Sequence, residues 1–482
     1  MRSVMMTCSQ HSKPLKKQRN SAFRARGILL AGIAVMATDI AASKGIFPDA
    51  SMITSARADD DDGGGFSGGG FRGSGGFRMR GIGLPIGIPR IRLGRLPKFA
   101  VPRKRYRKYT KARAVPVAAA VPRRSRSELI VAGLTPADIS TLQGEGFSIQ
   151  VTRSSETLGQ TVSRVGPPAG LGTIKALQRI EAVAPGVTAA RNDVFQRSAI
   201  GPYKAMGEAC GAACEAFVMT GWKANYLQCE LPEVIGVIDT GVDPAHPSLT
   251  GANVELASVR RSDRRPSDPA HGTGVVSLLV GQPGSDVVGV LPKAKIIAVD
   301  AFHRAGKSDA TDAFDLVAAL DLLAERDVRI VNLSLAGPEN AVLADSVAKY
   351  VDRGATLIAA AGPSSGKSGG YPAKYPGVIA VAAIDGEMRP SRLSARGTHI
   401  AYAGPGVGMT VASPGGKARL ATGTSFAAPI VSAAFASAKS DAGGDSLKTV
   451  QTLQNLAKDL GAPGRDPVYG WGLVQFPSKP GC

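Results

Sequence analysis

Residues 234–249 read VIGVIDTGVDPAHPSL, in which the apolar run VIGVI is followed by aspartate, threonine and glycine. Four later runs share its short, apolar character: KIIAVDAF (295–302), RIVNLSL (329–335), ATLIAAAG (355–362) and GVIAVAAID (377–385). Runs rich in β-branched residues or alanine, with almost no charge at their centres, are typical of buried parallel strands. We therefore interpret these five segments as neighbouring strands of one sheet.

Two segments between these runs have helical periodicity. Residues 312–327 (DAFDLVAALDLLAERD) and 339–354 (ENAVLADSVAKYVDRG) carry apolar residues at helical spacing and keep a polar face. Each can cover a sheet with its apolar face. The pattern predicts an α/β fold, a doubly wound parallel sheet flanked by helices. In such folds the functional sites lie at the carboxyl ends of the strands.

A region upstream of this sheet has a different pattern of predicted strands and helices. Residues 128–134 (ELIVAGL) and 147–153 (FSIQVTR) indicate strands, whereas residues 135–146 and 172–186 indicate helices, the first of them capped by Thr135. We expect a small α+β domain over residues 128–198. Its position ahead of the larger domain suggests a propeptide, although an accessory domain would show the same pattern.

The formal charge of +20 is unevenly distributed. Residues 1–200 carry 32 basic and 12 acidic side chains, whereas residues 201–482 carry 26 of each. Between Gly63 and Ser127 there are 17 basic and no acidic side chains. Such a segment has too little apolar patterning to fold, so we predict a disordered linker, glycine-rich and then basic, over residues 59–127. A flexible basic spacer or contact with an anionic envelope surface is favoured over nucleic acid binding, which arginines interleaved with aromatic residues would also permit.

The first 58 residues have the order of an export signal. Basic residues precede the apolar run GILLAGIAVMAT (27–38), which is too short to span a bilayer comfortably. Cleavage is expected after Ser43 or after Ala58, and the alternative is an uncleaved signal anchor. The sequence thus predicts a secreted or cell-envelope protein.

Five cysteines fall at positions 8, 210, 214, 229 and 482, and removal of a leader would leave four. An even number suits an oxidising compartment and disulfide bonds, although the sequence cannot choose among the three pairings. A zinc site is the alternative, which the absence of a histidine at ligand spacing disfavours.

Three segments carry residue types suited to nucleophilic catalysis. Asp239 ends the first apolar run, His271 begins the apolar segment HGTGVVSLLVG (271–281), and Ser425 follows a glycine in GTSFAAPIVSAAFASA (423–438). A serine nucleophile needs an imidazole to take its proton and a carboxylate to hold that imidazole. Each residue alone could be a helix or turn cap. Together they predict a catalytic triad.

The three segments resemble the signature motifs of the subtilisin-like serine proteases, in that family's chain order of Asp, His and Ser. The resemblance extends over about residues 233–476. It implies a serine endopeptidase that hydrolyses peptide bonds through an acyl-enzyme, with the domain at residues 199–482. The same resemblance implies a zymogen that processes itself, with cleavage between the small domain and Cys210.

The resemblance also implies where a substrate binds. Ser334, Leu335 and Ala336 would lie on the strand that pairs with an extended peptide through main-chain groups. Ala360, Ala361 and Gly362 would form the wall of the pocket for the side chain before the cleaved bond. Protein or peptide substrates and the chain's own small domain are the expected partners. No cofactor is expected, and calcium is suggested only by the resemblance, since no loop has acidic ligands at a recognisable spacing.

One position departs from the family pattern. Pro363 stands where the family usually has an asparagine whose amide donates to the oxyanion. Loss of that donor costs roughly 100-fold to 1,000-fold in turnover in a subtilisin. The backbone amide of Ser425 remains, and the hydroxyl of Thr424, Ser364 or Ser365 is a candidate substitute. We expect slow proteolysis; the alternative is a catalytically impaired binding or structural protein of the cell envelope.

His246, in the segment DPAHPSL, is a second candidate base. It lies seven residues after Asp239 in a turn bounded by prolines, so a structural role is favoured for it and for the nearby Asp243.

Overall fold

A computed structural model describes residues 124–482 apart from residues 198, 204–215, 365–369 and 479–482. The predicted leader, and the predicted linker up to residue 123, therefore lie outside the described residues. Within the described residues no helix is long and apolar enough to cross a membrane.

The centre of the fold is a parallel sheet of seven strands. Its order is β15–β14–β13–β11–β6–β8–β7, and every neighbouring pair is parallel. The strands are β6 (Ile235–Asp239), β7 (Val254–Ser258), β8 (Ile296–Asp300), β11 (Ile330–Leu333), β13 (Thr356–Ala360), β14 (Ile379–Ile384) and β15 (Ile400–Pro405). All five predicted strands are present in this sheet, and the predicted doubly wound α/β fold is confirmed.

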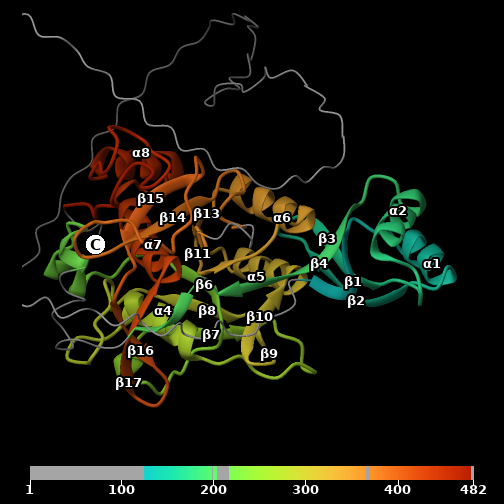
Figure 1. The fold of residues 1–482 in the computed structure, drawn as a ribbon, viewed down its shortest axis with the longest axis horizontal. Coiled ribbons are helices and arrows are strands. Elements are labelled where there is room, and N and C mark those ends of the chain that lie inside the picture. The colour runs from blue at the N-terminus through green and yellow to red at the C-terminus, as the bar shows by residue number, and fades with distance from the viewer. Residues whose placement is uncertain (1–123, 198, 204–215, 365–369, 479–482) are drawn as a thin grey trace, which may run out of the picture. The chain divides into compact units, whose positions relative to one another are not determined.

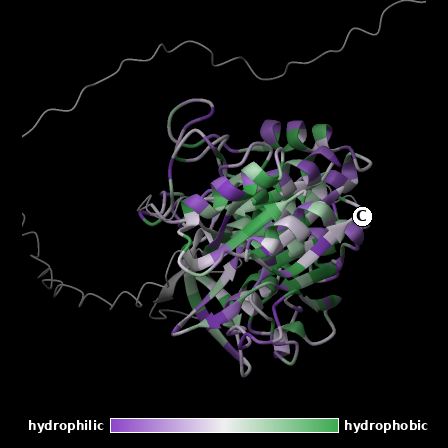
Figure 2. Ribbon diagram, turned by 90° about the vertical axis from the view of Figure 1, so that its right-hand side faces the viewer, coloured by the Kyte–Doolittle hydropathy of each residue, from purple (hydrophilic) through white to green (hydrophobic). Residues whose placement is uncertain are grey.

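Helices cover both faces of the sheet (Figure 1). On one face lie α4 (Ala270–Val280) and α7 (Thr424–Asp441), with α8 (Ser446–Leu456) packed on α7. On the other face lie α5 (Ala313–Glu325) and α6 (Ala341–Asp352), which fall within the two predicted helical segments. In Figure 2 the central strands are largely green (hydrophobic), whereas the helices carry both green and purple residues.

Successive residues of β8 alternate between the hydrophobic cores on the two faces of the sheet. Ile296 and Ala298 pack with α4 and α7, whereas Ile297 and Val299 pack with α5 and α6. Successive side chains of a strand point to opposite faces, so a strand covered on both sides has to be apolar throughout. Burial of each such aliphatic side chain contributes about 1.5–3 kcal/mol.

The upstream region forms a small antiparallel sheet with two helices. Its elements are β1 (Arg124–Ala132), α1 (Pro136–Gly144), β2 (Ser148–Ser155), β3 (Gln160–Gly166), α2 (Thr173–Val183) and β4 (Thr188–Arg197). Thr135 caps α1: its hydroxyl accepts from the amide of Asp138, and the Asp138 carboxylate accepts from the amide of Thr135. The sequence interpretation missed β3 and β4, and β4 is the strand that connects this sheet to the larger unit.

β4 continues the small sheet into the larger unit. The strand order is β2–β3–β1–β4–β10–β9, where β9 is His303–Ala305 and β10 is Ser308–Asp312. β4 also pairs with the short strand β12 (Leu335–Ala336). A separate antiparallel sheet joins β16 (Met409–Ser413), β17 (Lys417–Gly423) and β5 (Ala199–Tyr203). Two 3-10 turns, η1 (Ala224–Gln228) and η2 (Pro247–Leu249), complete the described elements.

Candidate active site

Asp239 and His271 meet at the carboxyl edge of the central sheet. Asp239 is the last residue of β6, His271 is the second residue of α4, and both side chains are almost fully buried. The Nδ1 of His271 lies 2.7 Å from Oδ1 of Asp239. When Nδ1 carries the proton that this carboxylate accepts, Nε2 is left as a proton acceptor.

The turn after Asp239 is held by a chain of hydrogen bonds that the sequence interpretation missed. The amide of Gly241 donates to the Ser267 hydroxyl (2.8 Å), which in turn donates to Oδ1 of Asp300 (3.0 Å). Asp300 is the neighbour of Asp239 across the β6–β8 pairing. Burial raises the pKa of Asp300, and the nearby charge of Asp239 acts in the same direction. The sequence signal that could have indicated this hydrogen-bond chain is the aspartate, Asp300, within the second apolar run KIIAVDAF.

α4 approaches the same turn very closely. The amide of Gly272 donates to Oγ1 of Thr240 (2.9 Å), and a Cβ on Gly272 would lie 2.4 Å from the Thr240 carbonyl oxygen. Only glycine allows two backbones to come this near. His271 is therefore placed by a contact that a larger residue next to it would disrupt.

We expect Gly272→Ala to lower the free energy of unfolding by about 1–3 kcal/mol, because the backbone of α4 or of the Asp239 turn has to move. Urea unfolding of the variant, made in an uncleaved Ser425→Ala background, measures this change. Gly386→Ala is the matched control, since a Cβ there meets no atom within 4 Å. Equal losses in the two variants would contradict the close-packing explanation.

Ser425 lies in the first turn of α7, after the N-cap residue Gly423. Its side chain is fully buried, and within the described residues neither its Oγ nor Nε2 of His271 has a hydrogen-bond partner. The ring of Phe426, the next residue, lies 5.4 Å from the His271 ring. The structure thus brings the three segments together and leaves the reactive atoms of serine and histidine without competing partners.

A second hydrogen-bond chain holds the Ser425 peptide. The Ser334 hydroxyl donates to the Ser425 carbonyl oxygen (2.9 Å), and the Asn332 amide donates to the Ser334 hydroxyl (2.9 Å). The Ser432 hydroxyl donates in turn to the side-chain Oδ1 of Asn332 (3.2 Å). Ser334 was predicted to lie on the substrate-pairing strand; in the structure its side chain supports α7.

Pro363 follows a tight turn beside Ser425. Gly362 has a left-handed φ of 82°, and its amide donates to Oγ1 of Thr424 (3.2 Å). Pro363 has no N–H and no polar side chain, so it can donate nothing to an oxyanion. The amide of Ser364 is already bonded to the Leu393 carbonyl oxygen (3.0 Å), and its side chain is exposed. Ser365 lies outside the described residues.

Two donors remain next to the nucleophile. Ser425 occupies the first helical turn, where backbone N–H groups have no partner within the helix, so its amide is available. The Thr424 hydroxyl accepts from Gly362 and keeps its own proton to donate. Both residues are almost fully buried, which strengthens their hydrogen bonds to a charge.

The predicted substrate strand is already paired with the chain itself. Leu335 and Ala336 lie opposite Arg197 and Gln196 of β4, in antiparallel register. On the other side of β4, Thr311 and Asp312 of β10 lie opposite Phe195 and Val194. β4 therefore occupies a slot between β12 and β10, as an extended peptide would.

From Ala199 the chain continues along β17, the strand that leads into the helix of Ser425. Ala199 and Ile200 of β5 lie opposite Gly423 and Thr422 of β17, which leads directly into α7. Ala360, Ala361 and Gly362 are buried where β13 ends, and a Cβ on Gly362 would lie 3.0 Å from the Cβ of Ala336. These residues and the β12 strand are thus adjacent.

His246 and Asp243 make structural contacts. Nδ1 of His246 accepts from the amide of Ser248, and Nε2 lies 3.0 Å from the Lys417 carbonyl oxygen. The Asp243 carboxylate accepts from the amides of Ala245 and Gly415. Both ring nitrogens of His246 are occupied away from Ser425.

Among the residues that the structure describes, no three or more His, Cys, Asp or Glu side chains form a group that could hold a metal ion. No step of the chemistry below uses a metal. Cys229 is buried, and the other cysteines lie outside the described residues. The disulfide pairing stays a prediction.

Comparisons with known proteins identify relatives of this chain. The subtilase family model matches residues 233–472. Subtilisin DY of Bacillus licheniformis is 30% identical over 252 residues, which are 50% of this chain and 88% of the relative. The minor extracellular protease Epr of Bacillus subtilis is 30% identical over 266 residues, 54% of this chain but only 40% of that protein.

A solved structure shares the fold. Fervidolysin from Fervidobacterium pennivorans, a keratinolytic enzyme related to subtilisin, aligns with a TM-score of 0.62 at 20% identity. The alignment covers 73% of this chain and 60% of fervidolysin. The chain covers 40%, 59% and 63% of the length of three of its relatives. From the motifs, the sheet and these matches, we conclude that this chain belongs to the subtilase family.

Proposed function

We propose that this protein is a serine endopeptidase in which Asp239, His271 and Ser425 form the catalytic triad. The observation that carries the proposal is the 2.7 Å contact between Asp239 and Nδ1 of His271, with Nε2 and the Ser425 hydroxyl buried nearby and unpartnered. This arrangement fits nucleophilic catalysis of peptide-bond hydrolysis.

The proposed chemistry has two halves. Nε2 of His271 removes the proton from the Ser425 hydroxyl while Oγ attacks the peptide carbonyl carbon, and the resulting imidazolium gives that proton to the leaving amine. Asp239 holds the ring and stabilises its positive charge. Water then attacks the acyl-enzyme with His271 again as base, which releases the new carboxylate and restores Ser425.

The developing oxyanion would be held by the Ser425 amide and the Thr424 hydroxyl. Both lie at the positive end of the α7 dipole, which favours negative charge. Since Pro363 contributes no donor, we propose a turnover below that of an enzyme with the usual asparagine.

The first substrate we propose is the chain itself. β4 pairs with β10 and with β12 as far as Arg197, and β5 begins at Ala199 and runs antiparallel to β17, away from Ser425. Ala199 lies opposite Gly423, two residues before Ser425. We propose cleavage of the bond between Ser198 and Ala199, which makes residues 128–198 a propeptide.

Processing at this bond predicts a mature form that begins AIGPYKAM, with Ala199 as its first residue. The reason is register: the pairings of Arg197 and Ala199 place only Ser198 between the two paired segments. Intact-mass measurement and N-terminal sequencing of the purified chain over time check this. A mature terminus downstream of Tyr203, with no fragment beginning at Ala199, would contradict the proposed register.

Incubation with a fluorophosphonate probe and casein tests the proteolytic function. We expect the probe to label Ser425 once the small domain has been cut away, and casein to be hydrolysed by the same preparation. If processed protein neither reacts with the probe nor cleaves casein, the proposed function is wrong.

Pro363 is the observation that favours a second candidate. Without its oxyanion donor, the fold could serve as a catalytically impaired binding or structural protein of the cell envelope. Probe labelling without casein turnover would support this alternative. We further propose export, which accords with the extracellular relative Epr; the signal and the basic linker that would contact an anionic surface are predictions from sequence.

A further inference from the structure

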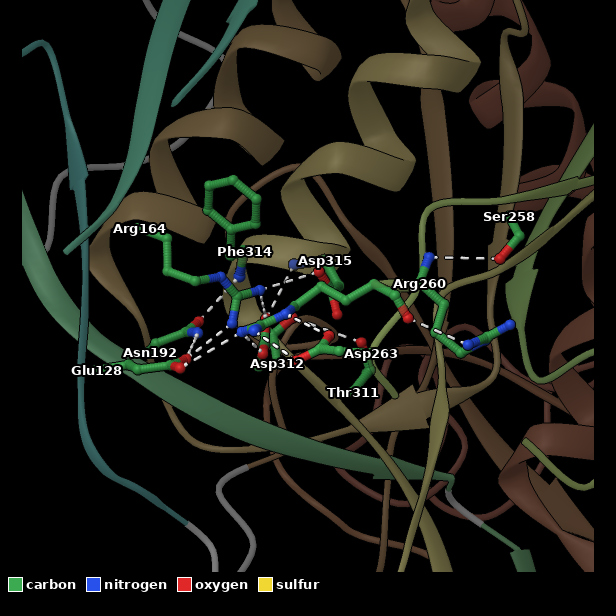
Figure 3. Close-up of polar contacts among 11 residues, drawn as sticks. Glu128, Arg164, Asn192, Ser258, Arg260, Asp263, Thr311, Asp312, Phe314 and Asp315 are labelled. Atoms are coloured by element: carbon green, nitrogen blue, oxygen red, sulfur yellow. Dashed lines mark hydrogen bonds and ion pairs between the residues drawn. The ribbon is translucent and has the colours of Figure 1, made fainter. Parts of the chain in front are cut away.

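A buried arginine joins the small domain to the peptidase unit. Arg164 of β3 is fully buried, and its guanidinium donates to both oxygens of Asp312 (2.9 and 3.0 Å) and to Oδ1 of Asp315 (3.0 Å) (Figure 3). The same group lies 4.6 Å from the centre of the Phe314 ring. Asp312 is the N-cap residue of α5 and Asp315 lies in its first turn, whereas Arg164 comes from the part that the proposed cleavage detaches.

The two carboxylates need this cation. Burial and the neighbouring Asp312 raise the pKa of Asp315 to about 7. Glu128 of β1, which binds Arg164 (2.8 Å), also belongs to the small domain. The charges of Arg153 and Arg261 act to lower the pKa of Asp315, and Arg153 of β2 also belongs to the small domain. Burial lowers the pKa of the nearby His303 ring. Removal of the small domain would leave Asp312 and Asp315 side by side, with Arg164 and Glu128 gone.

The vacated site lies directly beside the substrate slot. Asp312 is the residue of β10 that lies opposite Val194 of β4. Two residues earlier, Asn192 donates to Oε2 of Glu128 (3.2 Å), the same oxygen that accepts from Arg164. The side-chain Oδ1 of Asn192 accepts from the backbone amide of Phe314 (3.1 Å) in the first turn of α5. A side chain at the Asn192 position of a substrate would thus lie beside the vacated site, because Asn192 contacts both Glu128 and Phe314.

We propose that Asp312 and Asp315 form a guanidinium-binding site that selects an arginine in protein substrates, at the position that Asn192 occupies in β4. Arg164 fills this site in the uncleaved chain, and a substrate arginine replaces it in the processed enzyme. The inference rests on the proposed proteolytic function and adds a substrate preference to it. A guanidinium matches two carboxylates through paired, charge-assisted hydrogen bonds.

Peptides with the sequence of residues 188–203 test the site when processed enzyme cleaves them. We expect the Asn192→Arg peptide to have a kcat/KM about five- to tenfold above the unchanged peptide, a gain appropriate to one partly exposed charge-assisted contact. An Asn192→Glu peptide should be cleaved more slowly than the unchanged one, which separates charge from side-chain length.

The enzyme variant Asp315→Asn should bring the Arg-to-Asn ratio of kcat/KM close to one. Asp321→Asn is the matched control: Asp321 lies on the same helix and accepts from Gln160 (3.0 Å), but it does not contact Arg164. It should keep the ratio. In wild-type enzyme the Arg-to-Asn ratio of kcat/KM should also fall when the salt concentration rises from about 0.05 M to about 0.5 M, because salt screens the charge interaction. This measurement does not depend on the folding of a variant.

The outcomes separate the two proposals. Equal kcat/KM for the Arg and Asn peptides in wild-type enzyme would overturn the guanidinium site while leaving proteolysis intact. A preference that survives Asp315→Asn but is lost in Asp321→Asn would place the site elsewhere and overturn it as well. If processed enzyme cleaves none of the peptides and no casein, the proteolytic function fails and the inference fails with it.

Discussion

The Ser425→Ala chain is expected to remain a single uncut polypeptide under conditions in which the unaltered chain loses its small domain. Removal of the nucleophile of such a triad lowers turnover by about 10⁶-fold, and the methyl group cannot form an acyl-enzyme. Intact mass over time, with fluorophosphonate labelling of the same samples, measures both consequences.

Ser437→Ala is the matched control for this variant. Ser437 is buried on the same helix, but its hydroxyl donates only to the Ala433 carbonyl oxygen one turn earlier. This variant should process and label like the unaltered chain. Cleavage between β4 and β5 in a purified Ser425→Ala chain would show that another protease makes the cut, and it would remove self-processing from the proposal.

The variant with the second largest expected effect is Pro363→Asn, which should raise turnover on casein by roughly 100-fold to 1,000-fold. An asparagine directly after Gly362 would restore the amide donor that the family usually has at this position. We expect this donor to have a large effect on turnover because an oxyanion in a buried site has few other hydrogen-bond partners. Steady-state kinetics on casein and on a peptide of residues 188–203 measure the gain.

Pro363→Ala is the control that separates the effect of the added amide donor from the effect of removing the proline ring. Both substitutions remove the proline ring and its restriction on φ, but only asparagine adds a side-chain amide. We therefore expect little gain from alanine. Equal turnover in the two variants and in the unaltered chain would mean that Ser425 and Thr424 already stabilise the oxyanion sufficiently, and the explanation from the missing donor would be wrong.

The central sheet could be predicted because its signal is local. Each of its predicted strands, such as β6 and β13, is buried on both faces, so it has to be apolar at every position, and that pattern is visible in a few consecutive residues. α5 and α6 could be predicted for the same reason, since one apolar face repeats at helical spacing. The positions of Asp239, His271 and Ser425 at element ends followed from these boundaries.

β4 could not be predicted in this way. Its sequence TAARNDVFQR has no regular alternation, and only some of its side chains are buried. It is a strand because β1, β10 and β12 supply its hydrogen-bond partners, and β10 and β12 lie more than a hundred residues downstream. Ser267 and Asp300 were missed for a related reason, because their contact joins two segments whose proximity depends on the sheet.

The sequence by itself determined the fold class, the family motifs and the candidate nucleophile, base and orienting carboxylate. These depend on burial patterns and on residues within one segment. Only the tertiary structure decided that β4 pairs with β10 and β12, that Ser334 supports Ser425, and that Arg164 bridges Asp312 and Asp315. Each of these contacts joins segments far apart in the chain, and a polar side chain does not specify its distant partner until the hydrophobic core has brought the two together.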